Sequence, residues 1–188
     1  MTWIIIVGIF LLAFVPLVYA IPSSRQRRQA RLRKRATSDG VRVEVMYIPK
    51  MSADASEMVN AAGKILDPKI ECAAYQLLLP KPIDLPNLLL LKISNENKGS
   101  IFKVLDGWGV RNQHEMEYFR DHIDLVKLIE VSVASLPDDV LAFEFTRNKV
   151  SLLWRENDEL EEHYSKILET LKLLKEHQTG RENRSDFD

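Results

Sequence analysis

The chain has 188 residues, of which 26 are Lys or Arg and 27 are Asp or Glu, so its formal net charge is −1. Its single cysteine excludes an internal disulfide and suits a reducing compartment. Seven of the basic residues fall within residues 25–35, so residues 36–188 hold 19 basic against 27 acidic residues, a net charge of −8. The chain therefore consists of a short basic segment and an acidic body.

Residues 1–22 are predicted to form a membrane anchor. The nineteen residues from 3 to 21 carry no charge, and as a helix they would extend about 28 Å, close to the thickness of a bilayer's hydrocarbon core. The Lys and Arg excess lies on their C-terminal side, which predicts that the body of the chain stays in the cytoplasm and the N-terminus lies outside. The residues that we expect to mark the anchor are Trp3, Ile9, Phe14 and Ile21.

A cleaved secretory signal is the alternative interpretation of this segment. Val18-Tyr19-Ala20 has the small-residue pattern of a signal peptidase site. A signal peptide, however, has its positive charges before the apolar stretch, whereas here they follow it. The charges favour the anchor.

Residues 23–39 are predicted to form a basic juxtamembrane helix. At 100° per residue its basic side chains surround the whole helix, and Leu32 is the only large apolar residue among them, which predicts a solvated stalk rather than a helix lying in the membrane surface. No aromatic residues interleave with the basic ones, which disfavours nucleic-acid binding. The residues expected to set the topology and contact anionic lipid are Arg25, Arg27, Arg28, Arg31, Arg33, Lys34 and Arg35.

Residues 40–178 have the length of one compact cytosolic domain. Its first half predicts a strand over 41–48, a helix over 51–62 that ends at Gly63, and strands over 70–79 and 88–94. Turns are expected at 95–100 and around Asp106-Gly107. Trp108, which lies between two glycines, is interpreted either as a packed aromatic or as a partner contact.

The second half predicts a helix that is capped by Asn112, has Met116, Phe119, Ile123 and Val126 on one face, and ends at Leu136-Pro137. A two-residue turn at 147–148 predicts a hairpin whose facing pairs share one apolar face. These pairs are Phe145 with Val150, Phe143 with Leu152, and Leu141 with Trp154.

A final amphipathic helix is expected to start at Asn157 or Asp158 and to end at Gly180, and residues 179–188 are expected to form a polar tail. Leu173 is the one apolar residue on its wet side and is a second candidate partner contact. The element order predicts an α+β fold with a small antiparallel sheet, and its first six elements match a ferredoxin-like arrangement.

The sequence shows no pattern of catalytic, metal-ligating or cofactor-binding residues. None of the four histidines stands at metal-ligand spacing, and no phosphate-binding glycine loop or nucleophile motif occurs. We therefore expect no cofactor and no enzymatic activity. A membrane-face enzyme that uses scattered residues such as His114, His122 and Glu117 remains an alternative.

The chain resembles a group of uncharacterised single-pass inner-membrane proteins of bacteria, some of which are labelled as accessory subunits of the preprotein translocase. The resemblance covers most of the chain. It rests on the anchor with Pro22-Ser-Ser-Arg-Gln-Arg-Arg28, on Tyr75-Gln-Leu-Leu-Leu-Pro80, on Asp106-Gly-Trp108, on Leu136-Pro-Asp-Asp-Val-Leu141 and on Trp154-Arg-Glu156. It implies no activity.

The leading hypothesis is therefore a non-enzymatic inner-membrane protein whose cytosolic domain binds another protein, with the lipid bilayer as its other partner and no role in nucleic-acid binding. An accessory subunit of the preprotein translocase is the second hypothesis, because the layout of anchor and basic helix agrees with that label.

Overall fold

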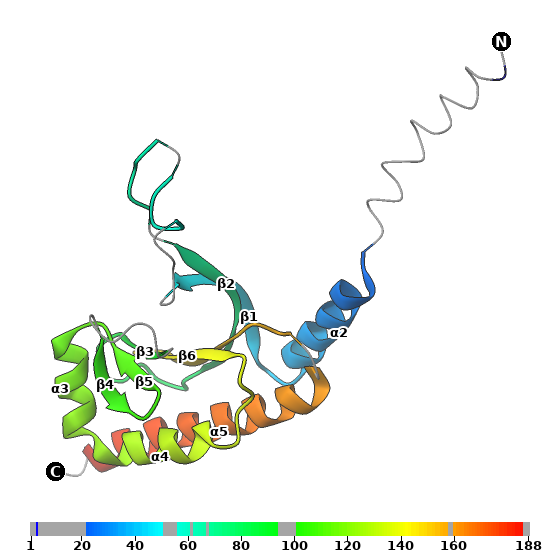
Figure 1. Ribbon diagram of the computed structural model, residues 1–188. Helices are drawn as coiled ribbons and strands as arrows, with labels where there is room; N and C mark the ends of the chain where they lie inside the picture. The colour runs from blue at the N-terminus through cyan, green and yellow to red at the C-terminus, as the bar shows by residue number, and fades with distance from the viewer. Residues whose placement is uncertain are drawn as a thin grey trace.

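The computed structural model describes Trp3 and residues 22–50, 56–60, 62–66, 68–93, 101–157 and 160–185. These residues form an α+β fold with one seven-stranded antiparallel sheet and four helices (Figure 1). Most of the expected anchor, including Ile9, Phe14 and Ile21, lies outside them, as does the turn expected over 95–100. None of the helices in the described ranges is both long and apolar enough to cross a bilayer.

The sheet has the strand order β1-β2-β7-β6-β3-β5-β4. Its strands are β1 (Arg42–Pro49), β2 (Lys69–Leu78), β3 (Leu88–Lys92), β4 (Phe102–Leu105), β5 (Trp108–Val110), β6 (Val140–Thr146) and β7 (Lys149–Trp154). The three expected strands of the first half are confirmed as β1, β2 and β3. The ferredoxin-like arrangement is wrong, because a split βαβ unit requires parallel strands and each neighbouring pair of strands here is antiparallel.

The hairpin of β6 and β7 has nearly the predicted register. Phe145 pairs with Val150 and Phe143 with Leu152, as expected. Trp154, however, pairs with Val140, because the ladder is irregular between Val140 and Ala142. This extra residue turns Leu141 to the opposite face of the sheet, where it packs on a second, smaller apolar cluster.

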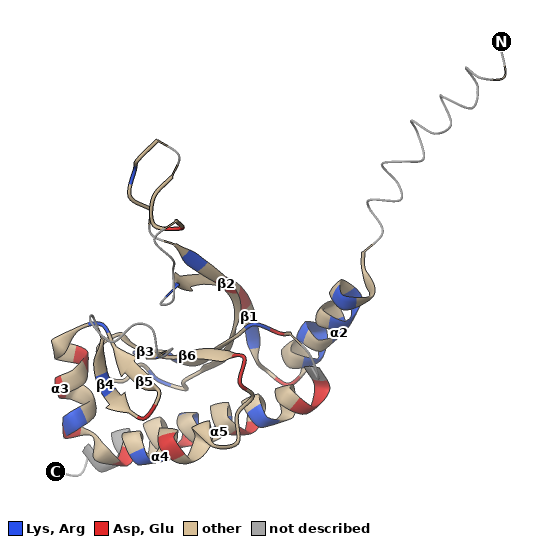
Figure 2. Cartoon of the chain, viewed as in Figure 1, with Lys and Arg blue, Asp and Glu red and all other residues tan. Residues whose placement is uncertain are grey.

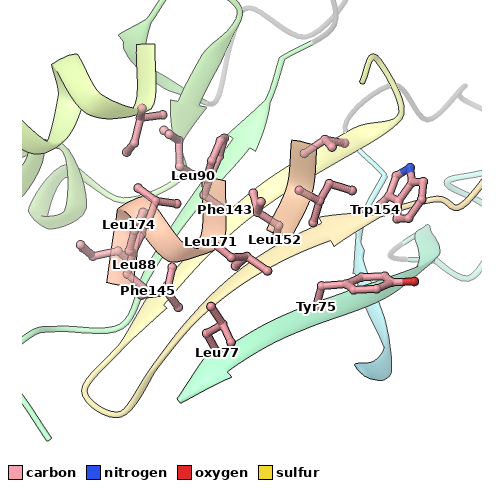
Figure 3. Close-up of a cluster of buried hydrophobic side chains, with 14 of the residues drawn as sticks. Tyr75, Leu77, Leu88, Leu90, Phe143, Phe145, Leu152, Trp154, Leu171 and Leu174 are labelled. Atoms are coloured by element: carbon pink, nitrogen blue, oxygen red, sulfur yellow. The ribbon is translucent and has the colours of Figure 1, made fainter. Parts of the chain in front are cut away.

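The main core lies between one face of the sheet and the helices. Helix α5 (Leu160–Ser185) packs on β7 and β2, whereas α3 (Gln113–Asp121) and α4 (Ile123–Val133) pack near β4 and β5. Figure 3 shows Leu171 and Leu174 of α5 facing the aromatic and leucine side chains of the strands. As predicted, α5 buries one stripe, consisting of Tyr164, Ile167, Leu171 and Leu174, with Leu168 partly buried.

The single helix expected after Asn112 is instead two helices that meet at His122. The backbone of His122 has φ −120° and ψ 58°, which is not helical, and Asn112 makes no side-chain cap hydrogen bond. The break changes the helical phase, so Ile123 is 59% exposed and the prediction that it lies on the core face is wrong. Phe119, before the break, is buried as predicted.

The helix expected over 51–62 is wrong for the part that the structure describes. Residues 56–60 and 62–66 form turns with a bridge between Val59 and Ile65. The side chain of Asn60 accepts hydrogen bonds from the backbone N–H groups of Ala62 and Lys64 and thereby stabilises a tight turn. This local polar contact competes with the helix that the spacing of apolar residues predicted.

The predicted C-terminal boundary also differs, because Gly180 lies inside α5 and the helix runs to Ser185. A polar tail therefore does not begin at residue 179. Glycine ends a helix when it adopts a left-handed conformation, and Gly180 is not among the residues with positive φ.

Candidate interaction surface

The basic segment forms helix α2 (Ser24–Ser38), which is attached to the domain rather than solvated on all sides. Ser23 and Gln26 form a reciprocal capping box at its start. Leu32 and Ala36 are 1% and 0% exposed and belong to the main core. The interpretation of this helix as a fully solvated stalk is therefore wrong, because two apolar residues one turn apart pack in the core and α2 contacts α5 and β1.

A buried carboxylate holds this helix in place. Glu156, in the link between β7 and α5, is 1% exposed. It accepts two hydrogen bonds from Nε of Arg33, at 3.0 and 3.2 Å, and one from Nη2 at 2.5 Å. The hydroxyl of Tyr75 in β2 donates to the same carboxylate at 2.6 Å, and Gln29 donates to the Glu156 carbonyl oxygen.

These contacts form one cooperative cluster, which we call the Glu156 latch: Gln29, Arg33, Tyr75 and Glu156. Burial, together with the hydrogen bond to Glu156, raises the pKa of Tyr75 far above its ordinary value, and the same carboxylate raises the pKa of Arg33. Glu156 has φ +52°, a left-handed conformation that costs a side-chain-bearing residue energy and that the surrounding contacts maintain.

Two further contacts stabilise the C-terminal half of α2. Arg35 pairs with Glu161 of α5 and lies 5.6 Å above the ring of Tyr164. The hydroxyl of Tyr164 donates to Asp39, the residue that ends α2, at 2.8 Å. Near the other end, Arg25 donates to Asn157.

The structure thus divides the seven basic residues that the sequence treats as one set. Arg25, Arg33 and Arg35 contact the β7–α5 link and α5. Arg27, Arg28, Arg31 and Lys34 are exposed, and Figure 2 shows basic residues in blue along α2. Arg27, Arg31 and Lys34 follow one another at helical spacing, so they present a continuous basic stripe on the face opposite Leu32.

Strand β1 forms one edge of the sheet and exposes two large apolar side chains. Val45 is 49% exposed and Tyr47 is 62% exposed. Because they are two residues apart, they lie on the same face of the strand. At the start of the strand, Arg42 and Glu44 pair with each other. Sequence analysis did not single out these residues, although the alternation of Val41, Val43 and Val45 had predicted the strand itself.

A second exposed apolar group lies in the link between β1 and β2. We call it the hairpin tip: Met58, Val59, Ile65 and Leu66, with exposed fractions of 43%, 43%, 82% and 43%. Figure 1 shows this link projecting away from the helices. Met58 and Val59 fall within the helix that was predicted over 51–62, so sequence reasoning missed this exposed group.

The sequence offered Trp108 and Leu173 as candidate partner contacts, and of these two only Leu173 lies on the surface. Leu173 is 43% exposed, as its place on the wet side of α5 predicted. Trp108 is 3% exposed and its ring packs on Phe143 with a centroid distance of 5.0 Å. The interpretation of Trp108 as a packed aromatic is therefore confirmed, and the alternative of a partner contact is wrong, because the β4–β5 hairpin turns its side chain into the core.

The residues of the enzyme hypothesis do not converge on one pocket. A cleft at the α3–α4 junction is lined by His122 with Glu176 and His177 of α5, but not by His114 or Glu117. His122 stacks on Tyr118 at 3.8 Å and contacts the Tyr118 carbonyl oxygen. Among the described residues no cluster of three or more His, Cys, Asp or Glu has the geometry of a metal site.

The only cysteine of the chain is a core residue. Cys72 is 4% exposed, and burial raises the pKa of its thiol to about 11. A thiol with so little thiolate at neutral pH is a poor nucleophile.

No family model, curated protein or solved structure matches this chain. The resemblance to single-pass inner-membrane proteins therefore stays a prediction from the sequence.

Proposed function

We propose that this chain is a single-pass protein of the bacterial inner membrane whose α+β domain, on the cytoplasmic side, binds an extended segment of another protein along β1. The observation that carries the proposal is an eight-residue edge strand with Val45 and Tyr47 exposed on one face. The anchor and its orientation come from the apolar residues 3–21 and the basic residues after them.

An edge strand offers unpaired backbone N–H and C=O groups to a partner strand. In this mode of binding the backbone hydrogen bonds supply affinity and alternate side chains supply specificity. Val45 and Tyr47 have the spacing that such alternate contacts need. The charges that commonly protect an edge lie at the start of β1 and pair with each other, so they do not interrupt the apolar part of the strand.

The Glu156 latch supports this function by fixing the position of β1 relative to the anchor. Helix α2 follows the predicted anchor directly and joins β1 through Asp39–Val41. Because α2 packs on the domain, the two move together, and a partner bound at β1 is held at a defined orientation to the membrane. A fully solvated stalk would leave that orientation free.

A photo-crosslinking experiment in cells tests the proposal. The full chain carries p-benzoylphenylalanine in place of Tyr47, and a matched control carries it in place of Phe102, which is 43% exposed on the opposite edge strand β4. We expect one discrete protein adduct at position 47 and none at position 102. Absence of an adduct at position 47, or equal adducts at both positions, contradicts binding along β1. An adduct with a translocase subunit would identify the partner in agreement with the second sequence hypothesis.

Topology is tested separately by adding protease to spheroplasts. We expect the domain to be degraded only after the membrane is permeabilised. Degradation in intact spheroplasts would place the domain outside the cytoplasm and refute the proposed orientation.

A further inference from the structure

The hairpin tip is a folded apolar turn. Val59 and Ile65 form a bridge, and the backbone N–H of Leu66 donates to the Met58 carbonyl oxygen at 2.7 Å. The N–H of Asn60 donates to the Lys64 carbonyl oxygen at 3.0 Å, which closes the turn. Four apolar side chains are thus held together on a short protruding segment and left exposed. Such a cluster on a soluble surface indicates contact with an apolar partner.

The tip lies on the side of the domain from which the chain leaves toward its apolar N-terminal segment. From Asp39–Val41, α2 runs back toward Pro22 for about 22 Å over its 15 residues, and β1 runs for about 26 Å over its eight. Figure 1 shows that both elements leave this junction toward the same side of the molecule, with the β1–β2 link beyond the end of the strands. The start of α2 and the hairpin tip are therefore two projections from one side of the domain.

Charge distinguishes this side from the opposite one. In the β1–β2 link and at the start of β2, the exposed Lys64 and Lys69 are offset by the exposed Glu57 and Glu71. The basic excess of this side therefore comes from α2, with its stripe of Arg27, Arg31 and Lys34. Figure 2 shows basic residues in blue along α2, and both basic and acidic residues in the β1–β2 link and on β2. On the far side α3 and α4 are acidic, with Glu115, Glu117, Asp121, Asp124 and Glu130 against Arg120 and Lys127, whereas α5 carries five acidic and five basic residues. An anionic lipid surface attracts the first side and repels the second.

We propose that the hairpin tip inserts into the headgroup and upper acyl region of the same anionic bilayer that holds the anchor. This inference rests on the anchoring part of the proposed function. The exposed side chains of Ile65 and its three neighbours enter the apolar boundary, while Lys64 and Lys69 remain among the lipid phosphates. Because the chain is already tethered at Pro22, insertion is intramolecular, so a shallow contact by four side chains is sufficient. The domain then rests on the membrane at two points, the start of α2 and the tip.

Depth-dependent fluorescence quenching in the full chain tests this contact. In a Cys72→Ala background, single variants Ile65→Cys and Leu173→Cys are labelled with an environment-sensitive fluorophore. Both are reconstituted in phosphatidylcholine and phosphatidylglycerol vesicles that contain a lipid with a nitroxide near the headgroup. We expect quenching at position 65 to be at least threefold greater than at position 173, a surface leucine on α5 that is 43% exposed. Equal quenching at the two positions overturns the inference.

Two additional measurements separate the possible failures. Flotation of the chain with vesicles reports the anchor alone: a chain that floats but shows no excess quenching at position 65 refutes only the tip contact, whereas a chain that does not float refutes both. In a chain labelled at Met58→Cys, adding Ile65→Asp should reduce quenching at least threefold while Trp fluorescence stays native. A crosslink from position 65 to a protein, without quenching by lipid, would identify the tip as a protein-binding site and overturn the lipid assignment.

Discussion

Replacing Arg33 by alanine should release α2 from the domain. The substitution removes three hydrogen bonds from a carboxylate that is 1% exposed and leaves it only the hydroxyl of Tyr75. Hydrogen bonds to charged groups contribute about 1.5–3 kcal/mol, and breaking a fully buried pair costs more. Because the Arg33 side chain is 38% exposed, water can reach the vacated space. We therefore expect a loss of about 2 kcal/mol in the free energy of unfolding.

Urea unfolding of the full chain in a mild detergent measures this loss. A Trp3→Phe background leaves Trp108 and Trp154, both in the core, as the fluorescent reporters. Arg31→Ala is the matched control, because Arg31 belongs to the same helix but is exposed on its outer face. It should change the free energy by less than about 0.5 kcal/mol. Equal midpoints for the two variants would refute the role assigned to the Glu156 latch.

The remaining predictions concern three other features. Gly109→Ala should cost at least about 2 kcal/mol by thermal unfolding, because the added Cβ would lie 2.6 Å from the Phe102 carbonyl oxygen. Gly180 lies inside α5, and a Cβ added there would meet no atom within 4 Å, so Gly180→Ala should instead stabilise the folded chain by about 1 kcal/mol. If both glycine substitutions changed the stability in the same direction, the packing described would be contradicted. The Cys72 thiol should resist alkylation at pH 8 until urea is added, and rapid reaction of the native chain would show that it is accessible. The folded state raises the pKa of Cys72 to about 11 and also raises the pKa of Tyr75. The stability that both groups contribute is complete below their unfolded pKa values and is lost as the pH rises through the folded values. Urea midpoints should therefore fall above about pH 9, and a constant midpoint up to pH 11 would contradict the burial of these groups.

Much of the sheet could be predicted from sequence because its signals are local. Alternating valines indicated β1, and a two-residue turn with matching apolar pairs indicated the β6–β7 hairpin. The apolar run Leu88–Leu91 lies in the strand predicted over 88–94, and its residues contribute to both apolar clusters, so both faces of this strand are covered. The short strands β4 and β5 were missed, because a glycine turn with three or four residues on each side carries too little periodicity to reveal a strand.

The errors arose where a residue outside the local pattern decides the conformation. Asn60 stabilises a turn where apolar spacing alone favoured a helix. One irregular position in β6 turned Leu141 to the opposite face, and the break at His122 exposed Ile123. The sequence around Trp108 is also compatible with a surface position. Its contact with Phe143 depends on the strand order, in which β3 lies between β5 and β6.

Four features followed from local sequence patterns: an apolar N-terminal segment followed by seven basic residues, an α+β order of elements, the pairing of the last hairpin and the apolar stripe of α5. Each depends on residues within a few positions of one another, because hydrophobic period and turn chemistry are local properties. The packing of α2 on the domain could not be predicted in this way, because Arg33 and Glu156 are 123 residues apart and the local sequence around each gives no sign of the other. The same holds for the hairpin tip and the exposed edge of β1, because the exposure of a side chain depends on which distant elements cover it.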